Sequence, residues 1–392
     1  MSTLTERKIV LTLASLSAIT PLAIDTYLPA IPTISKDFLT TIPNIEFSVS
    51  IYFFGMALGQ LFGGPISDAY GRRPMIFAGL FLFGICSLLL AFVTQIELFW
   101  LLRALQAFSG GLATVNVSAT VRDMFSGKES ARVFSLISMV MLMAPLIAPS
   151  IGSVILAFFD WNLIFIFISL YAFISLFHYL KTFPKVKKEK TKATPLKNYI
   201  EVFNHKQALV FIFAQVLCTS GMYTYITSSS FIYMEYFSIN SGLFSILFGV
   251  TVLMMMVFGR LNAWLVKTKE PISLLKFGML SQTLLGFILF VFHNDAGIYL
   301  IFPLIGLYIG MLGFIFSNSV ALTLEFFPHI SASANAIIGV LQYSIGALMG
   351  FVASSLHDGT LFPIFSVMAI VSICGTSLLF FGTKNYKSPH HH

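Results

Sequence analysis

Apolar residues along this chain fall into blocks of about 20, separated by short charged or turn-rich breaks. A block of that length covers the ~30 Å hydrocarbon core of a bilayer when it forms an α-helix. Transmembrane strands would instead require runs of ~10 residues with alternating polarity, and the chain has none. The pattern therefore predicts an all-α integral membrane protein with twelve spans, at residues 9–31, 45–66, 74–94, 98–118, 133–157, 161–182, 208–232, 240–264, 272–292, 297–320, 333–354 and 361–382.

The twelve blocks form two groups of six, separated by a polar stretch rich in lysine. Proline at 184 and 195 disfavours one continuous helix through that stretch. We predict an N-terminal six-helix bundle, a Lys-rich cytoplasmic linker, a C-terminal six-helix bundle and a short tail, over residues 1–182, 183–207, 208–383 and 384–392. The tail ends in His390, His391 and His392, which we interpret as a tag remnant. Two such bundles suggest repeats related by an axis along the membrane normal, with a site near the midplane.

Composition and charge support membrane insertion and indicate an orientation. Hydrophobic residues make up 57% of the chain and charged residues 10%, whereas soluble domains carry roughly a quarter charged residues. With the N-terminus in the cytoplasm, 21 of the 23 Lys and Arg residues fall on the cytoplasmic side, and only Lys36 falls outside. We therefore expect an inner-membrane protein with both termini and the linker in the cytoplasm. The net charge of +7 then requires no nucleic-acid partner.

Several chemistries lack the residues they would need. Cys86, Cys218 and Cys374 all lie inside apolar blocks, without the spacing of a disulfide framework or a metal site. The histidines show no metal-binding spacing, and no phosphate-binding loop is present. The sequence therefore predicts no metal, no cofactor and no enzymatic activity, and it disfavours ATP as the energy source.

A short turn between the second and third spans carries a dense motif. Residues 64–74 read GPISDAYGRRP, with Gly64, Asp68, Gly71, Arg72 and Arg73 at fixed spacing. The glycines permit a tight reversal and close helix approach. Asp68 lies near a helix C-terminus, where the helix dipole disfavours an anion unless a cation compensates. Arg72 and Arg73 are the nearby cations that could compensate it. The simpler alternative to a functional motif is a polar turn whose arginines follow the positive-inside rule.

Two charged residues, Asp25 and Arg103, are the ones that we place well inside predicted spans. An ionised Asp25 at membrane depth costs ~2.5 to 3.5 kcal/mol on insertion scales, so it must be protonated, paired or open to water. Burial disfavours its charged form and water entry favours it, so a cavity that opens alternately can load and unload a proton. Arg103 stays charged and also requires a partner or a wet cavity. The alternatives are packing hydrogen bonds for Asp25 and snorkelling or a structural ion pair for Arg103; direct pairing of the two stays open.

These motifs resemble those of the major facilitator superfamily. The 64–74 turn matches the family's loop motif, residues 102–106 (LRALQ) match its basic-residue motif, and residues 144–152 (APLIAPSIG) look like its antiporter motif. Residues 21–32 (PLAIDTYLPAIP) are similar to the first helix of the bicyclomycin and chloramphenicol resistance (Bcr/CflA) branch of drug:proton antiporters. Ala107 stands where the basic-residue motif usually has glycine, and the second half carries only a weak echo of the loop motif.

The resemblance implies a major facilitator fold and a role for each motif. Asp25 would couple transport to protons, and Arg103 would line the cavity and bias that proton site. The 64–74 turn would control conformational change. Pro145, Pro149 and Gly152 in the fifth span would form a bent, close-packed seal that limits proton leak, although an ordinary proline-kinked helix is the simpler interpretation.

Polar residues inside the spans are candidates for substrate contact with weaker support than the motif residues. They could point inward or serve only in helix packing. Our candidates for the cavity are Tyr27, Asn116, Met141, Gln215, Tyr223, Asn318 and Gln342.

We predict a monomeric, proton-coupled secondary transporter that exports drugs or small amphipathic molecules by alternating access. Its partners would be the substrate, protons and the lipid bilayer. The alternative is a specific carrier, for uptake or export, of a siderophore, another metallophore or a nutrient metabolite. The sequence does not determine the substrate, the transport direction, the proton stoichiometry or the participation of a second acid.

Overall fold

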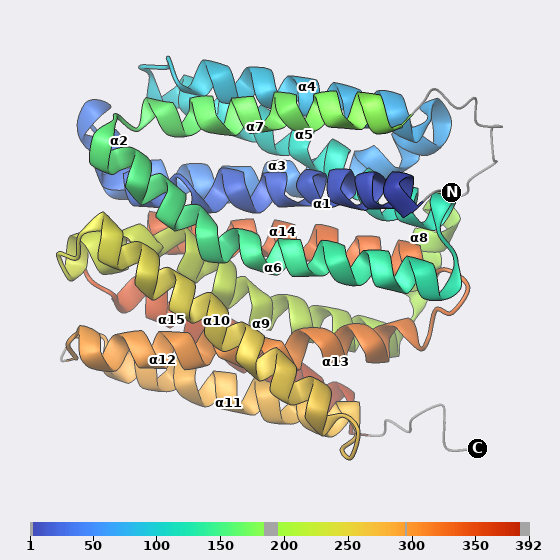
Figure 1. Ribbon diagram of the computed structural model, residues 1–392. Helices are drawn as coiled ribbons and strands as arrows, with labels where there is room; N and C mark the ends of the chain where they lie inside the picture. The colour runs from blue at the N-terminus through green and yellow to red at the C-terminus, as the bar shows by residue number, and fades with distance from the viewer. Residues whose placement is uncertain (1–2, 184–194, 295, 385–392) are drawn as a thin grey trace. The chain divides into compact units, whose positions relative to one another are not determined.

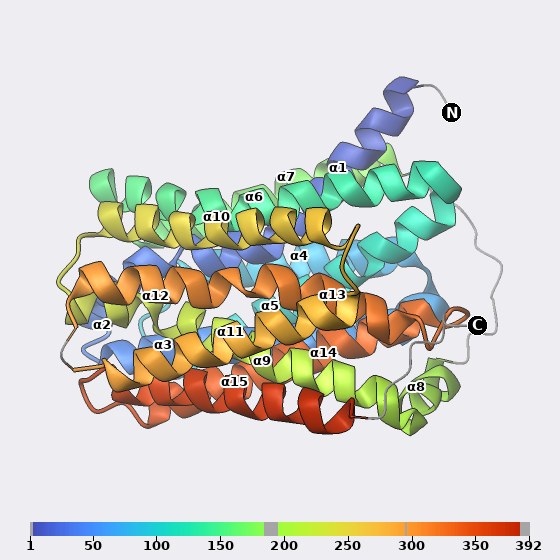
Figure 2. The ribbon, with the colours of Figure 1, turned by 90° about the horizontal axis from the view of Figure 1, so that it is seen from below.

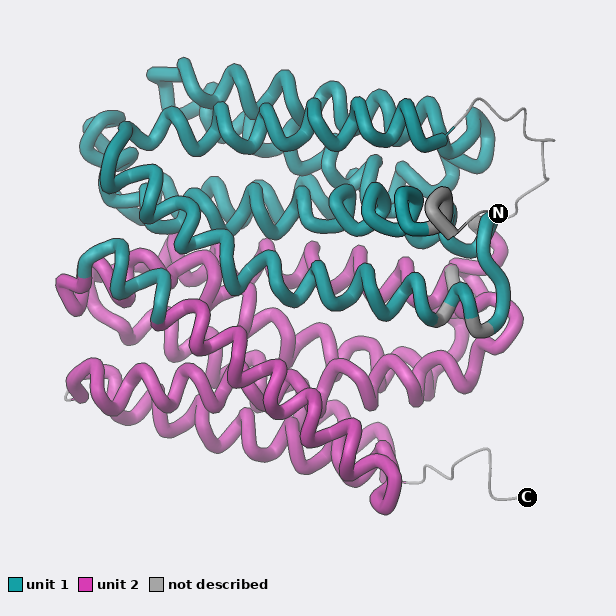
Figure 3. Tube along the Cα trace, viewed as in Figure 1, with its two compact units in different colours: residues 1–193, 240–246 teal, residues 194–239, 247–392 magenta. Residues whose placement is uncertain are grey.

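The computed structural model describes residues 3–183, 195–294 and 296–384. The chain divides into two compact units, coloured separately in Figure 3. Unit 1 comprises residues 1–193 with 240–246, and unit 2 comprises residues 194–239 with 247–392. Residues 184–194 contain most of the predicted linker lysines, so that part of the linker lies outside the described residues.

Unit 1 is built from helices that run nearly the full length of each apolar block. They are α1 (Thr3–Asp25), η1 (Leu28–Ala30), α2 (Ile31–Asp37), α3 (Ile42–Tyr70), α4 (Arg72–Leu90), α5 (Ile96–Met124), α6 (Gly127–Phe158) and α7 (Asn162–Thr182). Gly71 ends α3 with φ +97°, a conformation that glycine adopts without the steric cost other residues incur, and α4 begins at the next residue.

The first span is not the continuous helix over 9–31 that we predicted. α1 ends at Asp25, a turn follows, and the chain continues through η1 into α2. Pro29 explains the break, because it has no N–H to donate to the carbonyl of Asp25, four residues earlier. The two prolines at 29 and 32 were visible in the sequence, and they turn one span into a broken helix at the position of its acid.

Glycines on α3 let α5 approach closely, and the two helices run alongside each other in unit 1 (Figure 1). A Cβ at Gly59 would meet the Phe108 carbonyl and would lie 2.9 Å from the Gly111 Cα. A Cβ at Gly55 would lie 2.6 Å from the Ala104 carbonyl oxygen. This contact holds the α5 residue Arg103 beside Tyr52 of α3.

Unit 2 repeats the long helices and contains two irregular spans. Its elements are α8 (Pro195–Asn204), α9 (Lys206–Ser230), the π-helix η2 (Phe231–Tyr236), α10 (Ser241–Leu265), α11 (Pro271–Val291), α12 (Ile298–Gly310), α13 (Leu312–Leu324), α14 (Ser331–Ser355) and α15 (Phe362–Gly382). The predicted span 297–320 is thus two helices, α12 and α13, that meet at Met311. Within unit 2, α9 packs against α14 and α15, and α15 packs against α11 (Figure 2).

Part of the stretch that we predicted as linker is helical. In α8, Val202 is fully buried and packs with Ala208, Phe327 and Ala334 of unit 2. The apolar side of this short helix therefore belongs to the core of unit 2, and only its other side is available to solvent.

Twelve helices or helix pairs of the described chain are long and apolar enough to cross a membrane. They include the broken span 7–37, the α9–η2 span 206–236 and the α12–α13 span 298–324. The described residues form helices, turns and bends, with no strand. The predicted all-α fold with twelve spans is confirmed.

Candidate functional site

Asp25 lies buried at the point where the first span breaks. It is the last residue of α1 and is 4% exposed. The alanines of the 144–152 motif bring α6 onto α1 here, since Ala144 and Ala148 pack against Ala18 and Leu22. Two of the motifs that the sequence singled out are therefore adjacent in space.

Gly152 lets α6 approach the turn that follows α1. A Cβ on Gly152 would meet the carbonyl oxygen of Thr26, the residue after Asp25, and would lie 3.2 Å from Pro29 Cγ. Pro145 and Pro149 are both accommodated inside the continuous helix α6. The Pro149 carbonyl oxygen accepts a hydrogen bond from the Ser245 hydroxyl at 2.9 Å, and Ser245 belongs to the short segment of α10 that packs in unit 1.

Arg103 is fully buried and held by neutral groups. Its Nη1 donates to the Gln106 side-chain oxygen at 2.7 Å and to the Ala23 carbonyl oxygen at 3.2 Å. Its Cζ lies 4.5 Å from the ring centroid of Tyr27 and 4.4 Å from that of Tyr52. Ring faces attract a guanidinium, and such contacts contribute about 2 kcal/mol or more when water is excluded. The cation is thus stabilised mainly by two aromatic rings and by hydrogen bonds to two oxygens.

Asp25 and Arg103 form no ion pair in the described chain. The connection between them is indirect, because Arg103 donates to the carbonyl of Ala23, two residues before Asp25 on α1. The question that the sequence left open is therefore answered for this conformation: the two residues share one buried region without direct contact.

The same region contains a second acid that the sequence analysis missed. Glu46, which the sequence analysis did not single out, is the fifth residue of α3 and is 1% exposed. The Tyr27 hydroxyl forms a 2.7 Å hydrogen bond with the hydroxyl of Ser48, two residues after Glu46 on α3. A signal was present, since Glu46 shares one helical face with the buried residues Val49 and Phe53.

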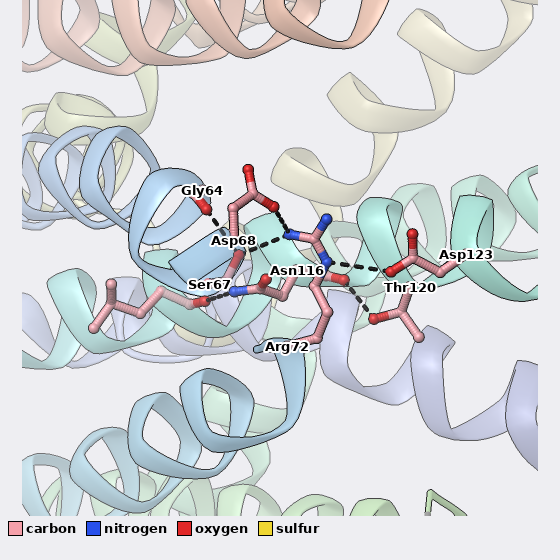
Figure 4. Close-up of polar contacts among 8 residues, drawn as sticks. Gly64, Ser67, Asp68, Arg72, Asn116, Thr120 and Asp123 are labelled. Atoms are coloured by element: carbon pink, nitrogen blue, oxygen red, sulfur yellow. Dashed lines mark hydrogen bonds and ion pairs between the residues drawn. The ribbon is translucent and has the colours of Figure 1, made fainter. Parts of the chain in front are cut away.

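The residues of the 64–74 turn gather around Arg72 (Figure 4). Arg72 Nη1 lies 2.8 Å from Asp68 Oδ1 and donates to the Ser67 hydroxyl at 2.7 Å. Arg72 Nε lies 3.4 Å from Asp123 Oδ2 at the end of α5. Asp68 at the C-terminal end of α3 is therefore compensated by Arg72, as the dipole argument requires. Asp123 was not predicted, because nothing in the spacing of the motif refers to α5.

Arg73 points to a different helix. Its Nη2 donates to the Leu180 carbonyl oxygen in the last turn of α7, at 3.5 Å. A cation at a helix C-terminus is stabilised by the helix dipole and by the unpaired carbonyls there. The two arginines of the turn thus connect α4 to α5 and to α7.

The predicted cavity residues fall into different environments. Tyr223 and Gln342 meet in unit 2, where Gln342 Nε2 donates to the Tyr223 hydroxyl at 3.0 Å. Gln215 is fully buried, and neither of its side-chain polar atoms has a hydrogen-bond partner among the described residues. Met141 is 46% exposed on α6.

Two other candidates donate hydrogen bonds from their side-chain amides. Asn318 donates to the Asn262 side-chain oxygen at 2.7 Å and so joins α13 to α10, which favours the packing interpretation for this residue. Asn116 donates to the Leu112 carbonyl of its own helix at 2.7 Å, close to the Arg72 cluster in Figure 4. The Asn116 side-chain oxygen has no hydrogen-bond partner among the described residues.

The described residues hold no group of three or more His, Cys, Asp or Glu side chains that could bind a metal ion. The chemistry that the buried residues of unit 1 can support is proton binding by carboxyl groups beside a fixed cation. Together with twelve membrane-length helices, these features define a polytopic membrane transporter.

The chain belongs to the Major Facilitator Superfamily, whose family model matches residues 13–351. This membership confirms the resemblance drawn from the motifs and the expected class, a transporter rather than an enzyme. A solved structure of a D-xylose-proton symporter superimposes with a TM-score of 0.76 at 16% identity, covering 99% of each chain, and supports the fold.

Two sequence relatives agree with the predicted branch. A bicyclomycin resistance protein homolog of Haemophilus influenzae is 30% identical over 387 residues, covering 97% of each chain. The multidrug resistance protein MdtL of Shewanella sp. (strain ANA-3) is 25% identical, covering 92% of this chain and 91% of the relative.

Proposed function

We propose that this protein is a proton-coupled antiporter that exports drugs or small amphipathic molecules, and that it works as a monomer. One observation carries the proposal: Asp25 is buried where the first span breaks, against the Pro-rich helix α6 and in the same region as the fixed cation Arg103. The printed names of the relatives, bicyclomycin resistance and multidrug resistance, support the class of substrate.

The roles of the residues follow from this arrangement. Asp25 would exchange the proton, Arg103 would bias its protonation, and the contact of Gly152 with Thr26 would close α6 over the site. The Arg72 cluster would stabilise one conformation of unit 1 by joining α3, α4 and α5. Tyr223, Gln342 and Gln215 are the strongest remaining candidates for substrate contact, because each keeps polar atoms within the buried part of unit 2.

We also propose an inner-membrane location with both termini in the cytoplasm. The charge distribution supports this orientation, because basic loops remain in the cytoplasm. Protons moving inward down their gradient would then drive export, with the electrical part of the gradient supplying ~2.3 kcal/mol per charge per 100 mV.

Flux in reconstituted vesicles tests the proposal. With an acidic vesicle interior, antiport predicts that wild type accumulates chloramphenicol or bicyclomycin above the level of protein-free vesicles. Asp25→Asn should abolish the dependence on the pH gradient. Asp160→Asn, which removes an exposed acid, should behave as wild type.

Three outcomes would contradict parts of this proposal. Gradient-dependent flux in Asp25→Asn would remove the central role of Asp25. Accumulation driven by an acidic exterior would indicate symport. A wild-type protein that binds and moves neither compound, but does move a siderophore, would establish the specific-carrier alternative.

A further inference from the structure

Unit 1 contains a half-open cavity that the proposed function does not use. Its volume is about 350 Å³, and it lies between the end of α2, the connection from α4 to α5 and the start of α7. These segments meet at the end of unit 1 where α2 is labelled in Figure 1. The lining residues are Asp37, Phe38, residues 91–94, Trp161 and Asn162. Ligand cavities in proteins are mostly apolar with a few polar groups and start at roughly 300 Å³, so a small molecule fits here.

One acid, Asp37, lines the cavity, and a hydrogen bond fixes its carboxylate. The Trp161 Nε1–H donates to Asp37 Oδ2 at 2.6 Å. Trp161 is 3% exposed whereas Asp37 is exposed, so the donor is anchored in the core while the acid stays in contact with water. This is the only hydrogen bond or ion pair of the Asp37 side chain among the residues that the structure describes. Its second oxygen, Oδ1, is therefore available to a ligand.

No basic side chain neutralises this carboxylate. None of the lining residues is Lys, Arg or His. Lys36, the residue before Asp37, is exposed and forms no ion pair with it in the described part of the chain. Opposite charges attract, so a ligand that offers a cation is drawn to the cavity and an anion is repelled from it.

Aromatic rings supply the apolar part of the lining. The ring centroids of Phe38 and Trp161 are 5.9 Å apart, and Phe38 packs edge-on against Phe99 at 5.5 Å, so core rings hold Phe38 in place. Phe92 is 70% exposed, which leaves its ring open to a ligand. An ammonium group near ring faces gains cation–π attraction in addition to its pairing with a carboxylate. The lining therefore matches a ligand with an apolar body and one positive charge.

This cavity is separate from the buried region around Arg103. None of Asp25, Tyr27 and Arg103 lines it. Trp161, which does, packs against Phe165 with ring centroids 6.0 Å apart, and Phe165 packs against Tyr27 at 5.9 Å. Contact from the cavity to the Arg103 region thus passes through two buried rings, so a ligand here would not touch the proposed proton site.

We propose that this cavity binds a small organic ammonium ion, with the ammonium group paired to Asp37 and the apolar body against Phe38 and Phe92. A primary or secondary ammonium fits better than a quaternary one, because it also donates a hydrogen bond to Oδ1. A calcium ion is a poorer match, since it takes six or more oxygen ligands and the cavity has a single carboxylate. The site goes beyond the proposed function, because it uses neither Asp25 nor the proton gradient.

Equilibrium binding of benzylamine and benzyl alcohol tests this site. The two probes share one ring, but only benzylamine is a cation at pH 7. In ligand-observed NMR titrations of the purified protein, with protein-free micelles as the blank, Asp37→Asn should weaken benzylamine binding by about 5- to 10-fold. It should leave benzyl alcohol binding unchanged. Asp160→Asn removes an exposed acid beside Trp161 that does not line the cavity, and it should bind both probes as wild type does.

Trp161→Phe provides a second variant. It keeps a ring in the core but removes the N–H that orients Asp37, and we expect a smaller loss of benzylamine affinity, of about 2- to 3-fold. Three results would overturn the inference: no benzylamine binding to wild type, equal benzylamine affinity in wild type and Asp37→Asn, or equal losses for both probes. Because the readout is binding, these results do not depend on proton-dependent flux, so failure of this site and failure of the proposed function are distinguishable.

Discussion

At the scale of single residues, this protein stabilises a buried cation without a direct ion pair. Arg103 uses two ring faces, one side-chain amide and one backbone carbonyl. Such neutral partners do not change charge when a proton arrives or leaves. In the proposed transport cycle, the cation would therefore stay in place while the protonation of Asp25 changes.

Another residue, His357, makes a pH-dependent contribution to stability. It lies between the last two spans, its ring centroid is 4.3 Å from that of Phe231, and its Nδ1 accepts a hydrogen bond from the Gly359 N–H at 3.3 Å. Burial lowers the pKa of His357 below its ordinary value of about 6.5, and the acids Asp358 and Glu235 oppose this only in part. The folded protein thus favours the neutral imidazole.

We predict that His357 stabilises the fold above about pH 6.5 and that this contribution is lost as the pH falls. The unfolded state binds the proton first, so acidification favours unfolding. Thermal unfolding of the purified protein at pH 7.5 and 5.5 should show a smaller drop in Tm for His357→Gln than for wild type. His178→Gln, at an exposed position, should show the wild-type drop. An equal drop in all three proteins would contradict the prediction.

At the scale of helices, a break in one helix and close packing at glycines position the buried charged residues of unit 1. Pro29 breaks the first span at Asp25, and Gly152 lets α6 reach the carbonyl of Thr26. In the same unit, glycines let α5 lie against α3, which places Arg103 beside Tyr52. Each of these buried charged side chains is therefore positioned by a helix contact some residues away from it.

Gly59 and Gly64 on α3 offer a matched comparison of this packing. A Cβ at Gly59 would meet backbone atoms of α5, whereas a Cβ at Gly64 would meet nothing within 4 Å. Because backbone cannot move as cheaply as a side-chain end, Gly59→Ala should destabilise the protein by about 1 to 3 kcal/mol. Gly64→Ala should leave stability unchanged or slightly higher, since alanine favours helix. Thermal or denaturant unfolding in detergent measures both, and equal stabilities would contradict the close packing of α3 and α5.

At the scale of the whole molecule, the distribution of basic residues predicts which loops face the cytoplasm. Lys36, in α2, and Lys267, after α10, are both exposed, and the positive-inside rule assigns them to opposite sides. Of the three cysteines, Cys374 is exposed and the other two are buried, so a Cys374→Ser background is suitable for labelling.

In that background, Lys36→Cys should react with a membrane-impermeant maleimide in intact cells. Lys267→Cys should react only after the membrane is permeabilised. Labelling of both variants after permeabilisation is the control for accessibility. The reverse pattern in intact cells would invert the proposed orientation, and with it the direction of proton-driven export.

The sequence alone was sufficient to predict the membrane as solvent, the twelve spans and the family. Those properties depend on block length, composition and local spacing, which the chain displays directly in motifs such as residues 64–74 and 21–32. It also identified Asp25 and Arg103, because charge inside an apolar block is conspicuous.

Only the tertiary structure decided which residues surround them. Glu46 was not singled out because it lies at the start of the predicted span 45–66, and its burial depends on neighbouring helices that cover its face of α3. Asp123 joins Arg72 from another helix, and Tyr27 and Tyr52 enclose Arg103 from two sequence-distant segments. Such contacts depend on how helices pack, which the spacing of residues along one helix does not specify.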